Sequence, residues 1–179
     1  MNVVVAEQAL ALARSRQRRY DDCIGPEKRR AKARAAAIIG RRPGAKVLDV
    51  GHEPFYAPEF ETRGMTLVPL NLPDGDMHTL SAVEEYDGAL AMHVLEHSPF
   101  PLYVLMLLHR AIRPGGWLYA AVPEPRKKWL KHEAHFATLK PMGWHRMLAD
   151  AGFRVGHYET GLFGPRSKEA RFLCTREGA

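Results

Sequence analysis

The sequence predicts an α/β fold, in which a mostly parallel sheet of about six strands carries helices on both faces. Tyr86–Met92 and residues 117–122 are apolar runs of strand length, and residues 102–112 between them repeat apolar side chains at helical spacing. A proline precedes this helix, and the sequence RPGG ends it sharply at 113–116. Two strands joined by a helix imply parallel strands and a right-handed crossover.

Chain length and composition indicate one domain. The chain has 179 residues, 46% of them hydrophobic, which is enough for a sizeable core. No apolar run reaches the roughly 18 residues that a spanning helix needs, so we expect no membrane contact. Cys23 and Cys174 stand far apart and without a partner motif, which is typical of a reducing compartment. We therefore expect a cytoplasmic protein.

The positive charge is concentrated in the first quarter of the chain. The formal net charge is +6, and residues 1–44 hold 11 Lys and Arg against 4 Asp and Glu, while the remainder holds 15 against 16. We predict helices over 3–20 and 27–39 here, and we separate residues 1–44, as a basic helical cap, from a main domain over 45–179. A cap with a solvated basic face and an arm that binds nucleic acid or another polyanion through residues 14–42 both fit this charge.

The rest of the chain supplies the other elements of the sheet. Only four residues separate Asn71 from Asp76, too few for a helix and a strand, so we expect one strand to be missing at an edge. The last strands should form an antiparallel hairpin joined by residues 161–168. The predicted strands are 46–50, Met65–Leu70, 153–159 and 170–176, and the predicted helices are 58–62 and 140–152.

A strand ending in MHVLEHS, followed by a helix and RAIRPGGWLYAAVP, resembles the fourth and fifth strands of class I S-adenosylmethionine-dependent methyltransferases. The similarity is to small-molecule enzymes of the ubiquinone-biosynthesis type and runs roughly from residue 46 to 153. It implies a Rossmann-like sheet, the cofactor S-adenosyl-L-methionine, and a cofactor site at the carboxyl ends of the strands. The missing strand corresponds to the third strand of that fold.

The resemblance assigns residues to the cofactor. Its glycine-rich turn falls on residues 51–55, where Glu53 and Phe55 stand in place of two glycines, so the turn either binds the cofactor in another way or has lost it. Asn71 stands where the family has an acid that grips both ribose hydroxyls. Asp76 would accept the adenine amine and Met77 would cover the ring, although residues 73–75 alone favour a plain surface turn. The assigned residues are Asp49, Gly51, His52, Glu53, Asn71, Asp76, Met77 and His93.

Two histidines are the catalytic candidates. The resemblance places His93 beside the transferred methyl and His135 in a loop over the acceptor, and either could serve as a general base. That loop could equally be a basic surface connection. HVLEH also fits the zinc-binding pattern H-x-x-E-H, but that pattern needs a continuous helix and here follows a strand, so we predict no metal site. Glu96 and His97 should order the start of the next helix.

The sequence therefore favours a methyltransferase that acts on a small-molecule acceptor. The alternative is a catalytically inactive protein of the same fold that serves as a binding or structural module. Its basis is the altered glycine-rich turn, Asn71 and the trimmed sheet. A polyanion-binding protein is the third hypothesis, and its affinity for nucleic acid should fall steeply with salt.

Overall fold

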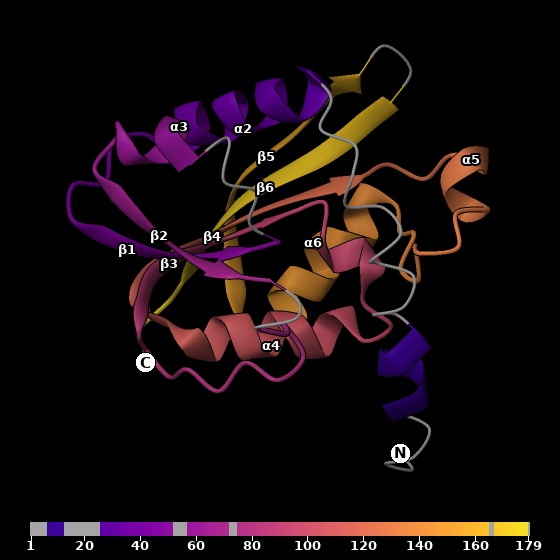
Figure 1. Ribbon diagram of the computed structural model, residues 1–179, viewed down its shortest axis with the longest axis horizontal. Coiled ribbons are helices and arrows are strands. Elements are labelled where there is room, and N and C mark those ends of the chain that lie inside the picture. The colour runs from indigo at the N-terminus through magenta and orange to yellow at the C-terminus, as the bar shows by residue number, and fades with distance from the viewer. Residues whose placement is uncertain (1–6, 13–25, 52–56, 72–74, 165–166, 179) are drawn as a thin grey trace.

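Six strands of the computed structural model form one sheet, which confirms the predicted strand number (Figure 1). The structure describes residues 7–12, 26–51, 57–71, 75–164 and 167–178. The strand order is β2-β1-β3-β4-β6-β5. The first four strands pair in parallel and β6 is antiparallel to both of its neighbours, as predicted. The strands are β1 (Ala45–Val50), β2 (Met65–Leu70), β3 (Tyr86–Met92), β4 (Ile112–Pro123), β5 (Phe153–Gly164) and β6 (Ser167–Arg176).

Helices cover both faces of the sheet, as Figure 1 shows, with α2 and α3 on one face and α4 and α6 on the other. The short 3₁₀ helix η2 follows β3, and α5 lies in the connection between β4 and α6. The helices are α2 (Pro26–Ile39), α3 (Ala57–Glu61), η2 (Leu95–His97), α4 (Pro101–Ala111), α5 (Lys127–Leu130) and α6 (Pro141–Asp150). Residues 7–12 form one further helical segment. No helix formed by the described residues has the length and hydropathy needed to cross a membrane.

The α2 helix is one of the helices that pack on the sheet, although it lies within residues 1–44, which we set apart as a cap. Its proline favours the first position of a helix, and its many alanines favour a helix interior. Its small residues Ala31, Ala35 and Ala36 are buried against the sheet, in one core cluster with Trp117 of β4. Small side chains allow a helix to approach a sheet closely. The domain boundary at residue 45 stays a prediction.

One glycine of β3 makes room for the large side chain at the centre of this cluster. A Cβ atom at Gly88 would lie 2.2 Å from Cε2 of Trp117, far inside van der Waals contact. Gly88 and Trp117 are register partners on neighbouring parallel strands. A residue without a side chain is therefore required at position 88 to leave room for the Trp117 ring.

The final hairpin is longer than predicted. Residues 161–168, expected to be a connecting loop, are largely strand, because Gly161 pairs with Glu169 and Leu162 with Lys168. The ladder continues through glycine-containing sequence because backbone groups, not side chains, make it. Likewise β4 begins at Ile112 and includes the RPGG residues that end α4. The α5 helix lies where we expected only a loop.

Candidate active site

The carboxyl ends of β1 and β2 lie side by side and bring together two of the predicted cofactor residues. Gly51 follows β1 with φ +75°, and its N–H donates to the carbonyl of Leu70, the last residue of β2. Asn71 therefore comes next to Gly51. The backbone carbonyl of Asn71 accepts a hydrogen bond from Gly75 N at 2.6 Å, which closes the following turn. His52 and Glu53 lie outside the described residues.

The Asp76 carboxylate fixes the loop between β2 and β3. Its Oδ1 accepts hydrogen bonds from the backbone N of His78 at 2.8 Å and from Nδ1 of the same ring at 2.7 Å. The His78 Nε2 lies 2.9 Å from the Oγ of Ser98, which is fully buried at the turn before α4. One oxygen of Asp76 is therefore engaged in hydrogen bonds within the protein that hold this loop. The adenine contact assigned to Asp76 stays a prediction.

Two further predicted cofactor residues face the protein interior. Asp49 is fully buried near the end of β1, and strand alternation places it on the α2 face with Val47. Met77 packs against the core cluster on the opposite face of the sheet. Neither residue lies on the exposed end of a strand in the way Gly51 and Asn71 do.

His93 follows β3 directly and is held between two carboxylates. Its φ of +54° lies in the left-handed region, which costs a non-glycine residue of the order of 1 kcal/mol. Its Nε2 donates to Glu169 of β6 at 2.5 Å, and its Nδ1 lies 3.7 Å from Oε1 of Glu96. Burial alone would lower the pKa of His93, but the hydrogen bond with Glu169 and the nearby Glu96 carboxylate outweigh it and raise the pKa to about 9. His93 is therefore a cation at neutral pH.

Glu169 begins a chain of ion pairs that leads from His93 to α2. Its other oxygen accepts from Nε of Arg171 at 2.5 Å, and Arg171 in turn donates to Glu159 of β5 at 2.8 Å. Arg34 of α2 donates twice to Glu159, at 2.7 and 3.1 Å. Glu169 is fully buried and only 8% of the Arg171 side chain is exposed. The chain thus ties the end of β3 to two other strands and a helix.

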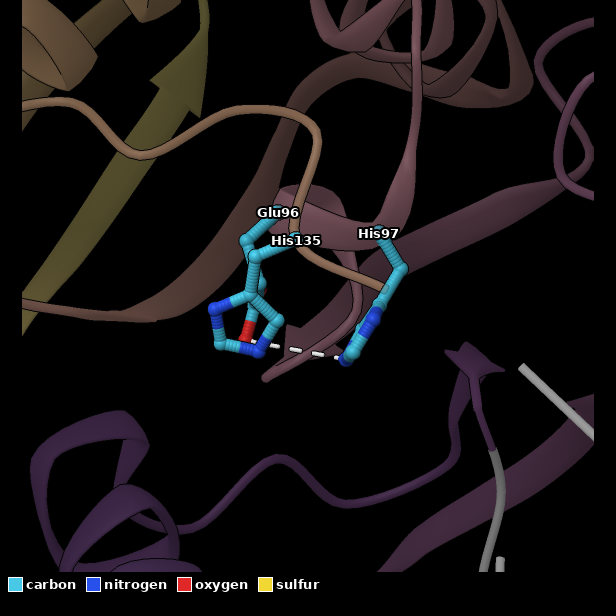
Figure 2. A group of neighbouring side chains, drawn as sticks. All are labelled: Glu96, His97 and His135. Atoms are coloured by element: carbon cyan, nitrogen blue, oxygen red, sulfur yellow. Dashed lines mark ion pairs between the residues drawn. The ribbon is translucent and has the colours of Figure 1, made fainter. Parts of the chain in front are cut away.

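A second group of polar side chains lies next to His93, and we call Glu96, His97 and His135 the His-Glu cluster. Glu96 and His97 belong to η2, and His135 comes from the connection between α5 and α6. Figure 2 shows their side chains pointing toward one another. One ligand atom from each lies within 4.8 Å of the other two. This confirms that the H-x-x-E-H residues do not form one helix, because η2 is a single short turn.

Backbone hydrogen bonds hold the loop that carries His135. The carbonyl of Glu96 accepts from the N–H groups of Phe136 and Ala137, at 2.8 and 3.1 Å. Nδ1 of His97 lies 2.9 Å from the carbonyl oxygen of Ala134. The residues on both sides of His135 are thereby fixed to η2, and the ring of His135 is directed at Glu96.

The charges of this group are set by burial and by neighbouring residues. Burial lowers the pKa of His135 to about 4, although Glu96 acts against this, so its ring is neutral. Burial would raise the pKa of Glu96, but the neighbouring His93 ring and the other nearby histidines lower it. The two predicted catalytic histidines therefore differ: His93 carries a proton that two carboxylates stabilise, and His135 has a ring nitrogen able to accept one.

Sequence reasoning did not find Glu169, Arg171 or His78. Glu169 and Arg171 stand two positions apart in one strand, and charged residues at that spacing normally indicate a solvated face of the strand. The signal that could have found them is the pairing of opposite charges at that spacing. The polyanion arm proposed for 14–42 lies partly outside the described residues, and Arg34 within it is engaged by Glu159.

Comparison with known proteins supports the resemblance. No family model matches the chain. A ubiquinone biosynthesis O-methyltransferase of Hydrogenovibrio crunogenus is 35% identical over 54 residues, which are 30% of this chain and 22% of that protein. The match thus spans less than a quarter of that relative.

Solved structures match over most of the chain. A 1,6-didemethyltoxoflavin-N1-methyltransferase of Burkholderia thailandensis, solved with 1,6-didemethyltoxoflavin and S-adenosylhomocysteine, has a TM-score of 0.72 at 17% identity and covers 98% of this chain and 88% of its own. A SAM-dependent methyltransferase of Aquifex aeolicus has a TM-score of 0.65 at 15% identity, and the aligned part covers 86% of this chain and 100% of that protein's chain. These likenesses establish the fold predicted from residues 86–123.

Proposed function

We propose that this chain, which has the fold of class I S-adenosylmethionine-dependent methyltransferases, transfers a methyl group from S-adenosyl-L-methionine to a small-molecule acceptor. A hydroxyl group is the first acceptor class to test, since the curated relative is named as an O-methyltransferase. Because fold alone does not fix function, the proposal needs support from the site itself. We also propose a cytoplasmic location, in keeping with Cys174 being a buried free thiol.

The observation that carries this proposal is the arrangement at the ends of β1 and β2. Gly51 takes a left-handed conformation there, and its N–H donates to the carbonyl of the last residue of β2, so Gly51 and Asn71 adjoin each other. Ligands of open α/β sheets bind outside the carboxyl ends of the strands. Asn71 has a carbonyl that can accept and an amide that can donate to ribose hydroxyls. These residues fit the cofactor, and when bound it would supply an electrophilic methyl group.

His135 and His93 would act differently on the acceptor. The neutral ring of His135 could take a proton from an acceptor hydroxyl, whereas His93 is already protonated and bound to Glu169. His93 would therefore position the site and hold positive charge near it. Exclusion of water and alignment of the acceptor oxygen with the methyl group would supply much of the rate.

The alternative of an inactive module receives no support from the curated relative and the two solved structures described above, each of which is named as a methyltransferase. The altered residues of the turn, Glu53 and Phe55, lie outside the described part of the chain. A binding measurement distinguishes the two hypotheses directly.

The test is calorimetric titration of the purified protein with S-adenosyl-L-methionine and with S-adenosylhomocysteine, followed by transfer of labelled methyl to a panel of hydroxyl acceptors. Asn71→Asp should bind the cofactor about fivefold more tightly, because a carboxylate accepts from both ribose hydroxyls in charge-assisted bonds worth about 1 kcal/mol more. Asn71→Leu, which removes both polar groups at similar size, should bind more weakly.

Absence of binding up to about 1 mM cofactor would overturn the proposal. Cofactor binding that neither Asn71 variant changes would show that the cofactor lies elsewhere. For the acceptor step, His135→Ala should lower kcat while cofactor affinity stays the same. Unchanged kcat in that variant would remove His135 from the reaction.

A further inference from the structure

The His-Glu cluster brings together side chains of the types that bind transition-metal ions. Glu96 offers a carboxylate oxygen, and His97 and His135 each offer an imidazole nitrogen, all within 4.8 Å of one another. Figure 2 shows the three side chains converging on one point from η2 and from the loop that carries His135. Two of the three are neighbours in sequence, and the third lies 38 positions further on, so the convergence is a property of the fold.

Glu96 is a buried carboxylate whose hydrogen-bonding capacity is not filled. Only 2% of the residue is exposed, and its Oε2 has no hydrogen-bond partner among the described residues. Its Oε1 lies 3.7 Å from His93 Nδ1 and 4.0 Å from His97 Nε2. A buried carboxylate oxygen without a partner is costly, and a bound cation would satisfy it.

The orientation of His97 is the second observation. A carbonyl oxygen can only accept, so the contact of Nδ1 with the Ala134 carbonyl requires a proton on Nδ1. Nε2 then carries the lone pair, and this is the atom that faces Glu96. Metal-binding histidines usually have this arrangement, in which one ring nitrogen donates to a backbone carbonyl and the other binds the ion.

The position of His135 is fixed before any ligand binds. The backbone on both sides of it is hydrogen-bonded to η2, through Ala134 on one side and through Phe136 and Ala137 on the other. Rigid support of this kind is what holds ligands in place in metal sites. The cluster is thus a supported donor set rather than three surface side chains that meet by chance.

We propose that Glu96, His97 and His135 bind a divalent first-row transition-metal ion, with Zn²⁺ as the reference ion. Two imidazoles and one carboxylate suit such ions, whereas Mg²⁺ and Ca²⁺ prefer sites made of oxygen ligands alone. Ligand atoms of a tetrahedral zinc site lie about 3.0–3.4 Å apart, so the side chains must close in by about 1 Å. Three protein ligands leave at least one position open, as in catalytic zinc sites.

This inference departs from the sequence prediction of no metal site, and the metal titration below decides between the two. If H-x-x-E-H formed one helix, His93 would be a metal ligand. Nε2 of His93 is instead bound to Glu169. The last two residues of the motif instead combine with a histidine from another loop. The inference does not depend on methyl transfer. With the ion bound, His135 would hold it and would not accept a proton.

The test measures metal binding directly on the tag-free protein of 179 residues, stripped beforehand with a chelator. Co²⁺ is added as a spectroscopic probe, and Zn²⁺ is titrated in competition with a chromophoric chelator. We expect one equivalent of Co²⁺, visible as d–d absorption, and its displacement by Zn²⁺. Each of the substitutions Glu96→Gln and His135→Ala should weaken Zn²⁺ binding at least tenfold, because each removes one of three ligands.

His145→Ala is the matched control, because His145 lies on α6 outside the cluster, and it should leave affinity unchanged. Thermal unfolding of every variant checks that it is folded, and His135→Gln replaces His135→Ala if the latter is not. Absence of Co²⁺ and Zn²⁺ binding by the wild-type protein would overturn the proposal. Binding that is unchanged in both Glu96→Gln and a folded His135 variant would overturn it equally.

Discussion

Replacement of Glu169 by glutamine should destabilise the protein strongly, although it changes a single atom of the side chain. Glu169 is fully buried between two cations, with His93 Nε2 and Arg171 Nε each 2.5 Å from its oxygens. Removing the charge of one member of a buried ion pair leaves the others desolvated and uncompensated, which costs about 3–5 kcal/mol. Glutamine retains an oxygen that Arg171 can use, so the loss should be at the lower end.

The contribution of His93 can be calculated separately. With a folded pKa of about 9 and an ordinary value of 6.5, its protonation stabilises the fold by about 2–3 kcal/mol at pH 7. Because the folded pKa is raised, this stability is fully present below pH 6.5 and is lost as pH rises through about 9. We therefore expect Glu169→Gln to cost about 2–4 kcal/mol at pH 7 and about 2 kcal/mol less at pH 10.

Urea unfolding of the wild type and of Glu169→Gln at pH 7 and pH 10, with a chelator present, measures both quantities. A lower midpoint at constant slope reports the loss of stability. The control is Glu177→Gln, which removes an exposed partner of Arg154 and should cost roughly 0–1 kcal/mol at either pH. A loss below about 1 kcal/mol at pH 7, or a loss independent of pH, would refute the reasoning about the pair.

Three other predictions concern stability and reactivity. Gly88→Ala should cost about 1–3 kcal/mol, measured as a lower unfolding midpoint, because its Cβ would overlap the Trp117 ring; an unchanged midpoint would contradict that packing. The ion pairs of Glu159 with two arginines lower its pKa to about 2. Glu159→Gln should therefore lower the free energy of unfolding by roughly 1–2 kcal/mol above pH 4.5, and this loss should disappear toward pH 2. A loss that is equal at pH 6 and pH 2.5 would contradict it. Burial raises the pKa of the Cys174 thiol to about 12, so in a Cys23→Ser background a thiol reagent should label the protein only in denaturant, and rapid labelling of native protein would show that the strand opens.

The sheet could be predicted because its determinants are local. Apolar runs such as Tyr86–Met92 and the helical spacing of residues 102–112 depend on neighbours in sequence, and both elements formed close to the expected bounds. The absence of one strand could also be predicted from a short segment, since four residues between Asn71 and Asp76 cannot hold a strand and a helix. The length of the last hairpin could not be predicted in this way, because it depends on backbone pairing between two strands. This pairing extends the hairpin beyond the apolar residues.

The site was predictable only in part. His93 was expected at the end of a strand and Gly51 and Asn71 at the ends of two others, and they lie there. The role of His93 depended on Glu169, 76 positions away, which the β4–β6 register brings opposite Pro123 and so beside the end of β3. No spacing rule in the chain specifies that register.

The sequence by itself determined the class of fold, the order of its elements and the strand ends that carry Gly51, Asn71 and His93. Periodicity, turn residues and chain length act within short segments, so they can be recognised without knowledge of the rest. Tertiary structure alone decided which histidine is a cation and which is neutral, and that Glu96, His97 and His135 converge. Protonation and ligand geometry depend on burial and on charges within a few ångströms, and residues far apart in the chain supply both.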